Sequence, residues 1–230
     1  MKKILRICGL VLVIGVIIAA IVSSMTMKPS NAEKVWDTRM TAGSLDAKNY
    51  FIIYSDLMCP YCIAFENAIV ENETAFEQYL ADNDILLEVR LSDFLYEYGE
   101  ARAINSRYSA EAVYCARDAG KFWDYYNLAI TTVWNDYFKD SGKAAFSVLN
   151  AKDKSYWIKL GKEIGLGEDF ENCVETDAPL AEIEKNAEKT SKLASGMPYF
   201  KFNNYTTSGF DPSWGWEYVL MYFEAGLESL

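Results

Sequence analysis

The chain has 230 residues, of which 51% are hydrophobic and 15% aromatic, enough for one large domain or a domain that carries an insertion. Its formal net charge is −11, and a surface this acidic repels phosphate backbones, which argues against nucleic-acid binding. The chain contains no histidine, so any zinc site would have to be built from thiolates alone.

Residues 1–27 have the pattern of an export element. Lys2, Lys3 and Arg6 form a basic start, and residues 7–27 carry no charge. A helix over this uncharged run would span roughly 31 Å, enough for the hydrocarbon core of a bilayer. Because the basic end stays in the cytoplasm, the chain from Lys28 onward is expected outside it. We predict a transmembrane signal-anchor; a cleaved signal peptide, leaving a secreted or periplasmic protein, is the alternative.

The next segments predict half of an α/β unit. Residues 28–34 are polar and form a linker, and residues 35–40 are expected to form a first strand. Residues 50–54 are continuously apolar, as in a strand covered on both faces. A long helix that begins with residues 59–62 is expected to continue to about Ala81, with a kink near Asn72, and a second clear strand follows over 85–91.

The pattern changes from about residue 93 to residue 195, where apolar side chains recur with helical spacing. Strand signals return over 198–203, followed by a turn with a short strand over 204–209 and a closing helix over 214–227. The chain is therefore predicted to be an α/β scaffold interrupted by helices. The helices expected within the interruption cover 110–117, 122–133, 156–164 and 178–193.

Cys59-Pro60-Tyr61-Cys62 lies where the central strand gives way to a helix. Pro60 suits a first helical turn, because its missing N–H has no partner to lose there. Cys59 then lies at the helix N-terminus, where free N–H groups and the helix dipole favour a thiolate. Cys62 follows one turn on, within disulfide reach and more buried. The pattern predicts a redox-active dithiol with Pro60 and Tyr61 as active-site neighbours.

Half of a zinc site and an inert structural disulfide are the alternatives for these two cysteines. A zinc ribbon places a second close pair of cysteine or histidine residues nearby, and this sequence has none. No metal site is therefore predicted.

Gly196-Met197-Pro198 stands at the start of the returning strand. A cis peptide bond before Pro198 would keep the backbone of Met197 facing the sulfur atoms, ready to pair with an extended peptide. Met197 and Pro198 are therefore the predicted substrate-binding residues.

These features together resemble the DsbA family of thioredoxin-fold thiol:disulfide oxidoreductases. The resemblance rests on the cysteine tetrad, the helical interruption and Gly196-Met197-Pro198, with further likeness in residues 54–58, 114–123 and 170–173. It covers the chain from about residue 35 to the C-terminus. It implies an α/β, thioredoxin-like fold with an inserted all-helical domain. The thioredoxin-like domain would comprise residues 35–92 and 196–230, and the helical insertion residues 93–195.

The resemblance also implies an enzyme that donates its disulfide to exported proteins with free thiols. No cofactor is expected, because the disulfide carries both electrons, and a DsbB- or VKOR-like membrane quinone reductase would reoxidise the dithiol. The chain departs from the family at Tyr61, where the best-known members carry histidine, and at Met197, where many carry valine or threonine. The alternatives are an isomerase or reductase kept reduced by a membrane partner, and a non-enzymatic envelope-assembly module.

Thioredoxins resemble one another in a buried aspartate six residues before the first cysteine, where this chain has Ile53. Asp56 is nearer to the dithiol, and we expect it to cap the loop or to stay solvated at the strand end. The lack of a buried acid argues against a dedicated reductase.

Cys115 and Cys173 both lie on apolar faces of predicted helices in the insertion. They are either two small buried residues or, in an oxidising compartment, a structural disulfide that takes no part in turnover.

Overall fold

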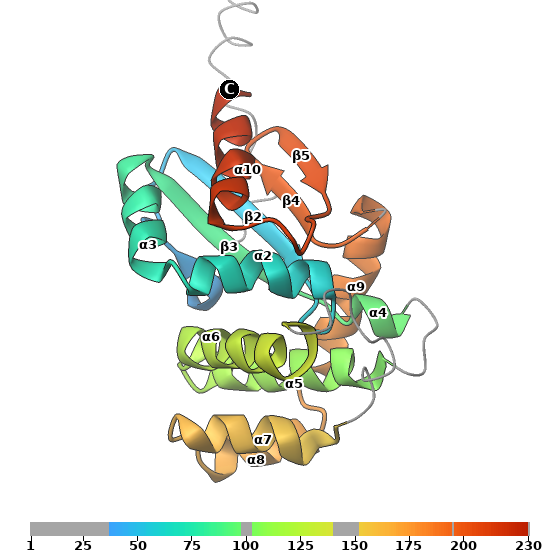
Figure 1. Cartoon of the computed structure of the whole chain (residues 1–230). Coiled ribbons are helices and arrows are strands. Elements are labelled where there is room, and N and C mark those ends of the chain that lie inside the picture. Colours follow the sequence, from blue (N-terminus) through green and yellow to red (C-terminus); the bar gives the residue numbers. More distant parts are fainter. Residues whose placement is uncertain (1–36, 98–102, 140–151, 195, 230) are drawn as a thin grey trace, which may run out of the picture. The chain divides into compact units, whose positions relative to one another are not determined.

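A five-stranded sheet with the strand order β1-β3-β2-β4-β5 is the centre of the fold (Figure 1). β2 and β3 are parallel, and every other neighbouring pair is antiparallel. In this computed structural model the described residues are 37–97, 103–139, 152–194 and 196–229, so the predicted anchor and linker lie outside them. The strands are β1 (Thr41–Ala42), β2 (Asn49–Ser55), β3 (Ile85–Leu91), β4 (Tyr199–Phe202) and β5 (Tyr205–Ser208).

The chain between β3 and β4 contributes only helices among its described residues, which agrees with the predicted fold class. The exact boundaries of the insertion stay predictions. None of the described helices is long and apolar enough to cross a bilayer. The helices are η1 (Thr38–Met40), α2 (Pro60–Val70), α3 (Glu73–Asp82), α4 (Phe94–Glu97), α5 (Ile104–Asp118), α6 (Phe122–Val133), η3 (Trp134–Phe138), α7 (Lys154–Glu163), α8 (Glu168–Glu175), α9 (Leu180–Leu193) and α10 (Trp216–Glu228).

Two of the predicted elements are wrong. The strand expected over 35–40 is absent over its described part, where Thr38–Met40 forms a 3₁₀ turn. The Asp37 carboxylate accepts a hydrogen bond from the Arg39 N–H, and this local bond competes with strand pairing. The single long helix expected after the dithiol is two helices, and they separate at Asn72, where the kink is predicted; the Asn72 side-chain amide donates to the Ala68 carbonyl at 2.9 Å.

Helix α2 lies between two hydrophobic cores, and it runs between the sheet and α6 in Figure 1. On one side Phe65 packs with the aromatic side chains of the sheet and α10, where the Phe51 and Phe223 rings stack with centroids 4.0 Å apart. On its other side Ile63 belongs to the core of the helical insertion, together with fully buried Trp157. The helix that carries the dithiol is therefore fixed from both sides.

Helix α10 approaches the sheet closely at Gly226, and an alanine there is expected to destabilise the protein. A Cβ atom on Gly226 would lie 2.1 Å from Cγ of Phe202, a fully buried side chain of β4. Helix and strand would have to separate, so we expect Gly226→Ala to lower the free energy of unfolding by about 1–3 kcal/mol in urea denaturation. Gly215→Ala, at the other end of the same helix and facing open space, is the control. An equal loss in both variants would contradict this packing argument.

Candidate active site

The N-terminus of α2 presents the two cysteines as predicted, with Cys59 as the N-cap residue and Pro60 at the first helical position. The Cys59 N–H donates to the Asp56 carbonyl at 2.9 Å, and the Cys59 carbonyl accepts the first helical hydrogen bond, from Ile63. The Cys59 side chain makes no capping hydrogen bond. Cys59 and Cys62 are both free thiols. The first sulfur thus lies at the N-terminus of α2.

The two thiols differ in exposure. Cys59 keeps 4% of its surface exposed, whereas Cys62 has none, and Tyr61 between them is 37% exposed. Of the two buried cysteines, only Cys59 therefore retains any exposed surface toward a polypeptide thiol. This asymmetry fits an exchange that begins at Cys59 and is completed by Cys62.

The structure brings Met197 and Pro198 to the dithiol from far along the chain. The Met197–Pro198 peptide bond is cis, and Sγ of Cys59 lies 3.9 Å from the carbonyl oxygen of Met197. The Pro198 carbonyl accepts a hydrogen bond from the Gly209 N–H at 2.8 Å, which ties this loop to the chain after β5. The fold therefore brings the backbone of one predicted substrate-binding residue, Met197, to the first of the two predicted reacting cysteines.

Asp56 is fully buried, so of its two expected positions the solvated one is wrong, and the one in which it caps the loop is confirmed by its bond to the Met58 N–H. Its carboxylate accepts three hydrogen bonds, from the N–H of Met58 (2.8 Å), the N–H of Leu95 (2.8 Å) and the hydroxyl of Ser106 (2.6 Å). Burial raises the pKa of Asp56 to about 6, although these hydrogen bonds favour the ionised form. The side chain joins the active-site loop to the helical insertion.

Glu66 is the residue of this site that the sequence analysis missed. It lies on α2 one turn beyond Cys62 and is 3% exposed. Residues four apart on a helix share a face, and the one charged residue in a largely apolar helical run is the available signal. A buried acid is therefore present after all, supplied by α2 in place of β2. The argument against a reductase that rested on Ile53 does not hold.

The Glu66 carboxyl is held by the insertion. The hydroxyl of Tyr126, on α6, donates to Oε1 at 2.5 Å. Burial raises the pKa of Glu66 to about 7, while the Tyr126 and Ser55 hydroxyls pull it back toward the ordinary value. Burial also raises the pKa of the Cys62 thiol well above its usual range, and neighbouring Cys59 and Glu66 raise it further. Cys62 is thus kept as a neutral thiol.

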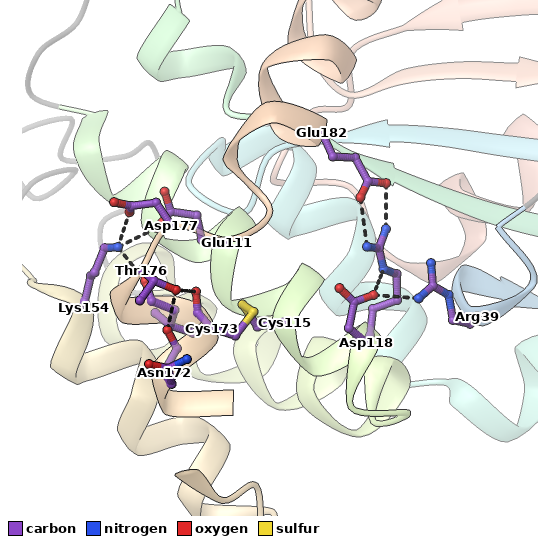
Figure 2. Close-up of a disulfide and its surroundings, with 12 residues drawn as sticks. Arg39, Glu111, Cys115, Asp118, Lys154, Asn172, Cys173, Thr176, Asp177 and Glu182 are labelled. Carbon is purple, nitrogen blue, oxygen red and sulfur yellow. Dashed lines mark hydrogen bonds and ion pairs between the residues drawn. A yellow bond between two sulfur atoms is a disulfide. The ribbon is translucent and has the colours of Figure 1, made fainter. Parts of the chain in front are cut away.

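The other two described cysteines, Cys115 on α5 and Cys173 on α8, are joined by a disulfide with their Cα atoms 5.8 Å apart (Figure 2). Ion pairs extend along the same helix on either side of it. Arg117 binds Glu182 of α9 through two hydrogen bonds, of 2.7 and 2.9 Å, while Lys154 of α7 contacts Glu111 of α5. The disulfide therefore staples the helical insertion. No group of three or more potential metal ligands gathers anywhere in the described part of the chain.

Comparison with known proteins found a matching family model and solved structures of similar fold. Residues 36–205 match a family model described as Thioredoxin. A thioredoxin-like oxidoreductase from Silicibacter pomeroyi is 18% identical with a TM-score of 0.56, covering 82% of this chain and 91% of its own. BdbD from Bacillus subtilis, in oxidised form, is 14% identical with a TM-score of 0.57, covering 82% and 92%. DsbA from Mycobacterium tuberculosis, in reduced form, is 17% identical with a TM-score of 0.56, covering 83% and 95%.

A search of curated proteins gave no significant match. The family match covers well over half of the sequence, and the solved structures share the fold through the sheet and the helical insertion. This chain therefore belongs to the thioredoxin family, with the fold of the DsbA-like thiol-disulfide oxidoreductases.

Proposed function

We propose that this protein is an extracytoplasmic thiol:disulfide oxidase that introduces disulfide bonds into exported proteins through Cys59 and Cys62. The observation that carries the proposal is the position of the Cys59 sulfur, at the N-terminus of α2 and 3.9 Å from the Met197 carbonyl. A substrate strand that pairs with the backbone at Met197 would place its own cysteine beside this sulfur.

In the oxidising direction, a substrate thiolate attacks Sγ of Cys59 in the Cys59–Cys62 disulfide. The sulfur–sulfur bond breaks, and its electron pair leaves on Cys62. A second thiolate of the substrate then attacks the substrate sulfur of the mixed disulfide and releases Cys59 as a thiolate. The substrate has lost two electrons and the dithiol has gained them. Stabilising the Cys59 thiolate stabilises the reduced enzyme, which makes its disulfide a stronger oxidant.

The membrane segment and the recycling partner belong to the same proposal. Residues 1–27 would anchor the domain outside the cytoplasm, where disulfides persist. A DsbB- or VKOR-like quinone reductase would take the two electrons from the reduced dithiol. An isomerase or reductase would use the same residues but would be kept reduced by its partner.

The equilibrium of the dithiol with glutathione tests the direction of the reaction. We expect a reduction potential of roughly −120 to −230 mV, because the helix end favours the thiolate without help from a histidine at the Tyr61 position. The measurement is the oxidised fraction of Cys59 and Cys62, trapped by alkylation across a series of glutathione buffers. A reduction potential below about −250 mV would contradict the oxidase proposal and favour a reductase.

Thiol trapping in intact cells gives an independent measurement. An oxidase should be found with most of its Cys59 and Cys62 in the disulfide form, because its partner withdraws electrons. An isomerase or a reductase should be found mostly with free thiols.

A further inference from the structure

A cavity of about 710 Å³ lies beside α2, and the sheet, α3 and α6 also contribute to its wall. Protein interiors are packed like organic crystals and contain few voids larger than a water molecule. The volume of this cavity lies within the range of roughly 300–1,000 Å³ that is usual for small-molecule sites. Neither cysteine of the dithiol is among the described lining residues, so the cavity is not part of the exchange site.

The wall of the cavity is mostly apolar. Ile53 and Leu87 line it from the sheet, Val70 from α2, Phe76 from α3 and Ile130 from α6. Water in an apolar cavity lacks the polar partners that hold a buried water molecule in place. A hydrocarbon group that entered from solvent would gain the free energy of burying its own apolar surface and that of the wall. The inner part of the cavity is therefore suited to an aliphatic chain.

The mouth of the cavity carries two carboxyl groups. The described lining residues that are exposed to solvent are Glu73, Glu77 and Ala81 of α3, with Gly43 and Ser44 from the turn after β1. Glu73 and Glu77 are four residues apart, so their carboxyl groups share a face of the helix. A molecule that enters the cavity therefore passes beside both of them.

The charges of the wall favour a cation. Glu66 is a third carboxyl in the wall, and it is buried with no hydrogen-bond partner for its Oε2 in the described part of the chain. The side-chain amide of Asn127 donates to Glu73 at 2.9 Å and leaves the charge of that carboxylate in place. No lysine or arginine is among the described lining residues. The wall therefore repels a carboxylate and attracts an ammonium group.

We propose that this cavity binds an aliphatic primary amine, with the hydrocarbon chain against the apolar wall and the ammonium group at the mouth beside Glu73 and Glu77. An ammonium group has three N–H donors and no acceptor, so it suits two neighbouring carboxylates. Its carbon chain would be buried while its charge stays near water, as in a lysine side chain that covers an apolar surface. The inference goes beyond the proposed exchange reaction and does not depend on it.

The test is isothermal titration calorimetry of the full-length protein in phosphatidylcholine nanodiscs, with the heat for empty nanodiscs subtracted. At about pH 7.5 n-octylamine is protonated, because its amine resembles that of lysine, with a pKa of about 10.4. We expect saturable binding of n-octylamine, roughly 3- to 10-fold tighter than that of n-octanol, which lacks the charge. n-Octanoate should not bind. n-Hexylamine should bind about 10-fold more weakly than n-octylamine, because it buries two fewer methylene groups.

Removal of the two carboxylates at the mouth isolates the ammonium contact. Glu73→Gln/Glu77→Gln should bind n-octylamine roughly 3- to 10-fold more weakly than the wild type does, and n-octanol equally well. Glu224→Gln/Glu228→Gln is the matched control, because it removes the same charge at the same spacing from exposed positions of α10 outside the cavity. This control should change neither affinity.

Filling the cavity isolates the contact with the hydrocarbon chain. Val70→Trp enlarges a half-buried lining side chain and should weaken the binding of n-octylamine and n-octanol together, by about 10-fold. Met221→Trp, at an exposed position of α10 outside the cavity, should leave both affinities unchanged.

Several outcomes would overturn the inference. They are the absence of saturable n-octylamine binding, binding of n-octanol or n-octanoate as tight as that of the amine, and an amine affinity that Glu73→Gln/Glu77→Gln leaves at the wild-type value. Wild-type affinity in a folded Val70→Trp variant would place the amine outside this cavity and would overturn the inference as well.

Discussion

Replacement of Cys59 with serine is expected to abolish dithiol–disulfide exchange, with the oxidation of a reduced two-cysteine peptide falling to its uncatalysed rate. The variant cannot form the Cys59–Cys62 disulfide, and its one remaining site thiol, on Cys62, has no exposed surface with which to meet a substrate. The measurement is the appearance of the oxidised peptide by mass spectrometry, started from pre-oxidised enzyme.

Cys62→Ser should fail in a different way. Its Cys59 thiolate, still at the helix end, can attack a disulfide-bonded peptide, but no second thiol is present to resolve the product. A covalent enzyme–peptide complex should therefore accumulate, visible on the intact protein by mass spectrometry and removed by reductant. Cys59→Ser should give no such complex. The contrast between the two variants assigns the attacking sulfur and the resolving sulfur separately.

A Cys59→Ser variant that kept its biological activity would favour the remaining alternative, an envelope-assembly module that uses the fold as a scaffold. The same result would leave the fold and family membership untouched, because these rest on the sheet, the insertion and the family match. The experiment therefore bears on function alone.

The sequence predicts those parts of the site that depend only on residues next to one another in the chain. Pro60 at the first helical position and the β-branched and aromatic run before it place Cys59 at a helix N-terminus without any distant contact. The second clear strand, over 85–91, has in the structure the bounds that the sequence predicts, because five aliphatic residues are concentrated in these seven positions and polar residues flank them. Four helices of the insertion, α5, α6, α7 and α9, agree with their predicted spans to within a few residues at most ends, though α5 begins earlier, at Ile104; α4, η3 and α8 have no predicted span.

The parts that were missed depend on contacts between distant residues. Asp56 is buried because its partners Leu95 and Ser106 arrive from 39 and 50 residues farther along the chain. Glu66 is buried where Tyr126, 60 residues farther along the chain, donates a hydrogen bond from its hydroxyl to the carboxyl group. Aspartate and glutamate side chains are by default expected to be exposed to solvent. Only packing against the helical insertion buries Asp56 and Glu66.

The same packing changes the functional argument. The sequence has no acid on the strand six residues before Cys59, where Ile53 stands, and this absence alone favours an oxidase. The structure supplies the acid from the helix, so the presence or absence of a buried carboxyl does not distinguish oxidase from reductase here. The reduction potential and the trapped redox state are the measurements that do.

Removal of the second disulfide is expected to cost stability without touching the chemistry. Cys115 and Cys173 are 58 residues apart, and closing a loop of this length removes conformational entropy from the unfolded chain. Cys115→Ser/Cys173→Ser should therefore lower the free energy of unfolding by about 4 kcal/mol. Urea denaturation measures the loss, best in a Cys59→Ser/Cys62→Ser background in which the dithiol cannot contribute.

The contacts around this disulfide explain why the fold should survive its loss. Arg117 still binds Glu182, Lys154 still contacts Glu111, and the core around Trp157 remains buried. With Cys59 and Cys62 intact, the double serine variant should oxidise the test peptide at the wild-type rate in the absence of urea. A loss below about 1 kcal/mol would mean that these noncovalent contacts, and not the staple, hold the insertion together. A loss of peptide oxidation in the fully folded variant would place Cys115 and Cys173 in the electron path, with Cys59 and Cys62 no longer sufficient for exchange.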